Sequence, residues 1–104
     1  MANEQSAIPV TTALKKLGED LRDARKRRRI PTALMAERIG VSRTTLHHLE
    51  RGEPTVGMGA LASAMYVLGL RDRFADMADA RFDPTGLTLD AERLPKRIRT
   101  KRNV

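Results

Sequence analysis

The segment VSRTTLHHLERG, residues 41–52, carries side chains that could contact nucleic-acid bases at helical spacing. Val41, Leu46 and Leu49 fall on one side of such a helix. The polar groups share the opposite side: Arg43, Thr44, His47 and His48. Arginine can donate two hydrogen bonds to guanine, a threonine methyl group can touch thymine, and a neutral imidazole can donate or accept one bond. This face is chemically suited to reading bases, although most polar helix faces are simply solvated.

Two other kinds of chemistry are open to these side chains. The adjacent histidines suggest a metal site, but neighbours on a helix point about 100° apart and the chain has no cysteine, so we expect no bound metal. An enzyme would need titratable groups gathered in a pocket. The histidines lie on a convex face, and the row of Asp72, Asp76 and Asp79 is typical of a hydrated helix surface. We therefore expect neither catalysis nor a cofactor.

The elements around this segment have the pattern of two short helices joined by a tight turn. Residues 30–32 (IPT) break the preceding helix, because proline cannot donate a backbone hydrogen bond and disfavours a helical residue before it. A helix over 32–39 then ends at Gly40, and Ser42 supplies an N-cap hydroxyl for the next one. This is a helix-turn-helix signature.

Composition favours packed helices for the whole chain. It has 104 residues, of which 40% are hydrophobic and only 3% aromatic. Apolar spacing predicts further helices over 14–24, 58–68 and 71–80, and DPTG at 83–86 is typical of a turn. We predict an all-α, compact four- to five-helix bundle over residues 12–82. A flexible leader, 1–11, precedes it, and a C-terminal extension with a mobile basic tail, 83–104, follows.

Charge is distributed unevenly along the chain. Its formal net charge is +7, with +6 over residues 15–51, −3 over 52–90 and +5 over 91–104. A basic front half indicates a polyanionic partner. The N-terminus does not have the pattern of a secretory signal, and the uncharged stretch 54–70 is short for a bilayer span. We expect a cytoplasmic protein without a membrane partner.

Residues 21–52, LRDARKRRRIPTALMAERIGVSRTTLHHLERG, resemble the helix-turn-helix domain of the lambdoid-repressor (XRE, Cro-type) family. The resemblance extends over about residues 14–70 and implies a compact all-α bundle that binds a palindromic operator in double-stranded DNA as a two-fold dimer. It places the four polar residues named above at base-contacting positions, and Ser42 and Thr45 where phosphates are met. It also implies an ion pair between Arg25 and Glu50 that ties the first helix to the recognition helix.

The sequence departs from this family in its second helix and before its fourth. The family usually opens the second helix with a glutamine that bonds a phosphate and braces the recognition helix, whereas this chain has Thr32 after Pro31. Thr32 can reach a phosphate but cannot brace over the same distance. Leu34 stands where a charged residue is common, and Gly57 and Gly59 weaken the start of the helix over 58–68.

The back half resembles a narrower group. Residues 60–70, ALASAMYVLGL, are similar to the helix before the dimerising part of HipB-like antitoxins, which pair with HipA-like serine/threonine kinases. This implies a homodimeric repressor of its own operon that is also the antitoxin of such a kinase, with dimer contacts from 58–82 and 86–89. The alternatives are a stand-alone phage or metabolic repressor of the same family and a protein-binding module that has lost DNA recognition.

The basic tail over 93–102, RLPKRIRTKR, has three open roles. It can follow DNA phosphates beyond the operator, dock on an acidic groove of a partner protein, or only increase solubility.

Overall fold

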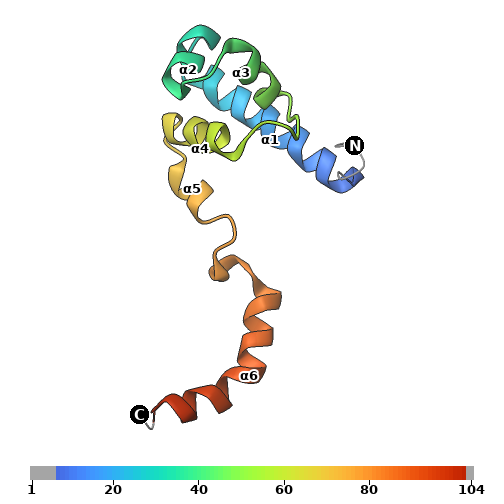
Figure 1. Cartoon of the computed structure of the whole chain (residues 1–104), viewed down its shortest axis with the longest axis vertical. Coiled ribbons are helices and arrows are strands. Elements are labelled where there is room, and N and C mark those ends of the chain that lie inside the picture. The colour runs from blue at the N-terminus through green and yellow to red at the C-terminus, as the bar shows by residue number, and fades with distance from the viewer. Residues whose placement is uncertain (1–6, 103–104) are drawn as a thin grey trace. The chain divides into compact units, whose positions relative to one another are not determined.

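The computed structural model describes the backbone of residues 7–102 and the side chains of residues 7–93. It divides into two compact units, the first ending at Arg71 and the second beginning at Asp72. The helices, labelled in Figure 1, are α1 (Ile8–Arg27), α2 (Thr32–Ile39), α3 (Arg43–Glu50), α4 (Met58–Val67), α5 (Arg71–Ala75), the short 3-10 helix η2 (Ala80–Phe82) and α6 (Pro84–Arg102). No strand occurs between residues 7 and 102, so the predicted all-helical class is confirmed for the part of the chain that is described.

The first helix begins earlier than its apolar stripe predicts. The flexible leader over 1–11 is wrong for its last four residues, because α1 starts at Ile8. Pro9 lies in the first turn, where its fixed φ suits a helix and its missing N–H would have had no partner. Ile8 is 81% exposed, so nothing in the core favours this turn and only the local proline signal marks it. Residues 1–6 lie outside the described part.

The core of the first unit lies between α1, α2, α3 and α4. Helix α1 packs against α3, and α2 packs against both α3 and α4, as Figure 1 shows. The fully buried large side chains are Met35, Leu46 and Leu68, one each from α2, α3 and the end of α4. Burial of such side chains stabilises a fold by about 1.5–3 kcal/mol each. Aliphatic side chains therefore build this core, as the low aromatic content predicts.

All four helices of the first unit end in a left-handed residue. These are Arg29, Gly40, Gly52 and Gly69, with φ between 55° and 86°. After each of them the next N–H bonds back to a carbonyl of the last helical turn, for example Val41 N to Ala36 O at 3.0 Å. This is the Schellman arrangement, which glycine adopts at little cost. Only the turn after α1 uses a residue with a side chain.

Helices α1 and α3 approach each other through two glycines. A Cβ added to Gly18 would lie 2.6 Å from both Glu50 O and Gly52 N, and one added to Gly52 would overlap the Leu14 carbonyl. Such separations are below normal contact, so the backbones touch directly. The start of the loop after α3 is thereby held against α1.

Helix α4 is apolar around most of its circumference but is only partly covered within its own unit. Ala64 and Met65 are buried, whereas Met58 is 73% exposed and Tyr66 is 69% exposed. Gly57 and Gly59 have open space around their Cα atoms, so no close approach requires glycine there.

The second unit corrects two expectations about its local structure. The helix expected over 71–80 ends at Ala75, and a 3-10 turn follows at Ala80–Phe82. The turn expected at 83–86 is instead the start of α6, where Asp83 Oδ1 accepts a hydrogen bond from Gly86 N–H at 3.0 Å. The backbone of the expected extension is helical from Pro84 through Arg102.

Candidate nucleic-acid interface

The start of α3 is fixed by its cap. Ser42 has an extended backbone, and its Oγ accepts a hydrogen bond from Thr45 N–H at 3.1 Å. The same hydroxyl donates to Thr45 Oγ1 at 3.1 Å. Ser42 Oγ is thereby engaged twice within the first turn of α3, whereas Thr45 Oγ1 makes one bond and has capacity for a second partner. The predicted N-cap is confirmed, and it orders the first turn of α3 before any partner binds.

The inner side of α3 holds the helix in the fold. Leu46 is 1% exposed and Leu49 is 6% exposed, as their spacing predicts. Glu50 is also buried and receives two hydrogen bonds from Arg25, from Nε at 2.7 Å and from Nη2 at 3.0 Å. A third guanidinium bond goes to Ile30 O at 2.9 Å. The expected ion pair between Arg25 and Glu50 is therefore present, and its two parallel bonds fix the angle as well as the separation of α1 and α3.

The outer side of α3 carries the predicted polar groups. Arg43, Thr44 and His47 are exposed, and His48 is half-buried with a side chain 41% exposed. The guanidinium of Arg43 has no hydrogen bond or ion pair to any residue in the described part of the chain. The predicted division of the helix into an apolar inner side and a polar outer side is thus what the structure contains.

Each imidazole has a charged neighbour that sequence spacing did not identify. Arg51 Nη1 lies 3.2 Å from His47 Nε2. Because arginine has only donors, Nε2 accepts this bond and the ring proton of neutral His47 is on Nδ1. His48 Nδ1 is shielded from solvent and lies 2.9 Å from Glu53 Oε2, close enough for a direct polar contact. His48 therefore offers only its Nε2 to a partner.

The charge of Glu53 is stabilised by this arrangement. The close contact with His48 holds the pKa of the Glu53 carboxyl below its ordinary value, and the positive charge of Arg51 acts in the same direction. Glu53 follows the glycine that ends α3, so its backbone position is set by the helix end. The spacing of His48 and Glu53 across that turn is the signal that could have identified the contact.

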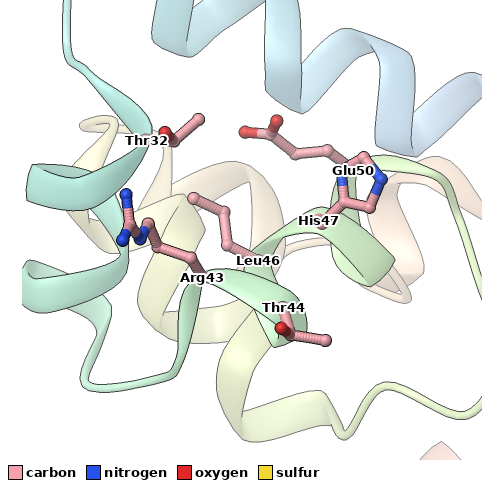
Figure 2. Close-up of a pocket in the computed structure, with 6 residues that line it drawn as sticks. All are labelled: Thr32, Arg43, Thr44, Leu46, His47 and Glu50. Atoms are coloured by element: carbon pink, nitrogen blue, oxygen red, sulfur yellow. The ribbon is translucent and has the colours of Figure 1, made fainter.

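The outer side of α3 borders an open hollow of about 320 Å³, shown in Figure 2. Thr32, at the start of α2, lies across this hollow from Arg43 and His47. The remaining lining residues are Thr44, Leu46 and Glu50. Of the seven residues predicted to contact DNA, four line this hollow. Ser42 and Thr45 lie at the first turn of α3, and His48 faces Glu53 instead.

The arrangement is that of two helices at a tight turn, the second of which presents polar side chains outward from a buried back. The sequence profile of the helix-turn-helix domain matches residues 16–76, from the third turn of α1 through α5. The chain belongs to this helix-turn-helix family. No curated protein and no solved structure matched the chain.

Membership of the helix-turn-helix family makes the first unit a DNA-binding domain. Helices α2 and α3 are the two helices of the motif, on either side of its turn. The described residues contain no group of three or more histidine and carboxylate side chains placed to hold a metal ion. None of the helices in the described part is long and apolar enough to cross a membrane.

Proposed function

We propose that this helix-turn-helix protein is a sequence-specific transcriptional repressor that inserts α3 into the major groove of an operator. The observation that carries the proposal is the geometry of α3, whose first turn is capped, whose back is buried and whose far end is fixed by Arg25. A base-reading helix needs this rigidity, because hydrogen bonds to base edges discriminate only when their donors are held in place.

Four outward side chains are proposed to contact bases. Arg43 has a free guanidinium at the start of the helix, where recognition helices approach base edges, and it can bond guanine O6 and N7 together. Thr44 offers a methyl group and a hydroxyl. His47 offers Nδ1–H as a donor while Arg51 occupies its other nitrogen, and His48 offers Nε2.

Three hydroxyl residues are proposed to contact phosphates. Thr45 offers a hydroxyl whose bond to Ser42 Oγ leaves capacity for a second partner. Ser42 acts mainly through the cap and presents its backbone to the duplex. Thr32 supplies a hydroxyl on the opposite side of the hollow. Contacts on both sides of α3 would set its register in the groove without specifying sequence.

Selection of binding sites from a randomised duplex pool tests this function. Wild-type protein should enrich one motif, and Arg43→Ala should weaken binding to it by about 1–3 kcal/mol while relaxing preference at one base position. Lys15→Ala, which removes an exposed charge of α1, is the charge-matched control and should keep the motif. Unchanged specificity in Arg43→Ala would contradict the assignment.

We also propose that the repressor binds as a homodimer to a palindromic operator. The support is the exposed apolar surface of α4, where Met58 and Tyr66 have no cover within their own unit. Two copies related by a two-fold axis would present two α3 helices to half-sites about one helical turn apart. Light scattering should give twice the chain mass, and the selected motif should be an inverted repeat; a monomer with a single half-site would refute this proposal.

The biological setting is proposed from the resemblance of α4 to HipB-like antitoxins. The protein would act in the cytoplasm as the antitoxin of a HipA-like kinase and as the autoregulator of their operon. A kinase reading frame beside the gene, and a stable complex of the two co-expressed products, would support this. A phage or metabolic gene neighbourhood would favour the alternative, a stand-alone repressor with the same DNA-binding surface.

A further inference from the structure

Arg29 is the only residue other than glycine with a positive φ between residues 7 and 102. Its φ of 55° places it in the left-handed region, where a side chain crowds its own backbone. The turn needs this conformation, because Ile30 N–H returns to Arg25 O at 3.2 Å and ends α1. Glycine meets the same requirement without strain, as it does after the other three helices of this unit.

The side chain of Arg29 gives the folded domain nothing in return for this strain. It is exposed, and its guanidinium has no hydrogen bond or ion pair within the described residues. Neighbouring Arg28 differs, since its Nη1 donates to Ala24 O at 2.8 Å. A free charge on a strained residue indicates a use outside the fold.

The turn that carries Arg29 is rigidly connected to α3. Arg25 bonds Ile30 O with one guanidinium nitrogen and Glu50 with the other two, so the turn and the last residue of α3 share one anchor. Three residues after Arg29, Thr32 lines the hollow beside Arg43 (Figure 2). Three residues span at most about 10 Å, so the Cα of Arg29 lies within that distance of the Cα of Thr32.

We infer that Arg29 binds a phosphate of the DNA strand that borders the groove occupied by α3. The inference rests on the proposed function, because a helix in the major groove has a phosphate backbone along each side. A cation carried by a turn that is anchored to the recognition helix can reach that backbone and set the register of α3, whereas the four outward residues of α3 read bases. The arginine in the left-handed position is thus a DNA-binding residue rather than a structural one.

Arg29→Gly tests this inference because it moves stability and binding in different directions. The urea midpoint should stay unchanged or rise, since strain is relieved. Operator affinity at low salt should fall about tenfold, as expected for one lost charge-assisted contact. The slope of log K against log salt should become shallower by about 0.9, the value for one phosphate. Arg29→Lys keeps the charge and should retain most of the slope.

Lys15→Gln is the control for general electrostatic attraction. It removes an equal charge from an exposed position about 18 Å along α1 from Arg27, the last residue of that helix. The inference would be overturned if the slope of log K against log salt for Arg29→Gly equalled that of wild type or of Lys15→Gln. It would also be overturned if the urea midpoint of Arg29→Gly fell far enough for unfolding to explain the lost binding. The measurement is made beside Arg43→Ala. If that variant also keeps its sequence preference, the proposed function itself fails.

Discussion

Replacing Glu50 with leucine should destabilise the protein strongly, because it leaves a buried guanidinium without its counter-charge. Both side chains of the Arg25–Glu50 pair are 8% exposed. Removing one partner of a buried, doubly bonded pair costs about 3–5 kcal/mol, since the remaining charge has lost its water and gained no replacement. Small domains are stable by about 5–15 kcal/mol, so Glu50→Leu should lose a large part of the total.

A double-mutant cycle separates the coupling energy between Arg25 and Glu50 from the effects of each substitution on other residues. Urea unfolding followed by far-UV circular dichroism gives the free energy of unfolding for wild type, Glu50→Leu, Arg25→Met and the double variant. Arg25→Met also frees the Ile30 carbonyl, which adds about 1 kcal/mol to its loss. The double variant has no buried charge and should recover most of the stability lost in Glu50→Leu.

Two results would refute this reasoning. If either single variant lost less than about 1 kcal/mol, the pair would behave as a solvated surface contact. If the losses of the single variants simply added in the double variant, the two side chains would not be coupled across α1 and α3.

Three further predictions concern single residues. Gly18→Ala should lower stability by about 1–3 kcal/mol in urea unfolding, although alanine is the better helix former, because the added methyl group meets backbone atoms of the α3 exit; a gain would show that the helices can separate freely. Ser42→Ala should cost about 0.5–2 kcal/mol through the lost cap, and Ser42→Asp should restore it; equal stability of all three proteins would exclude the cap as a stabilising contact. Wild type should be more stable than Glu53→Gln above pH 4.5, because the pKa of Glu53 in the folded protein lies below this ordinary value. The difference in stability should vanish as the pH falls through the lowered pKa. A difference that grows in acid would contradict the lowered pKa.

The helix-turn-helix could be predicted from sequence nearly residue by residue. Gly40 is a specific signal for the end of a helix and Ser42 for the start of one, because a left-handed turn and a capping hydroxyl each restrict the residue type that fits. They place the end of α2 and the start of α3 where the structure has them. The ion pair of Arg25 with Glu50 could be anticipated only from the family resemblance, since 25 residues separate the partners.

The sequence predictions are wrong at the starts of α6 and α1, where a local helix-start signal was present but was interpreted differently. Asp83 followed by Pro84 is an N-cap followed by a first-turn proline, but the same residues also favour a turn, and no apolar period decided between them. Pro9 marks the start of α1 in the same way. The contacts of Arg51 and Glu53 with the imidazoles depend on how the chain turns after α3, which side-chain periodicity does not report.

At Gly18 and Gly52 the two backbones are in direct contact, and no side chain lies between them. The distance between the first and third helices is consequently a property of the peptide backbone and not of how well the aliphatic interior is filled. If α3 reads bases as proposed, substitutions among the buried aliphatic residues should lower the melting temperature without changing the preferred DNA sequence. Thermal stability and the proposed target preference would then change independently.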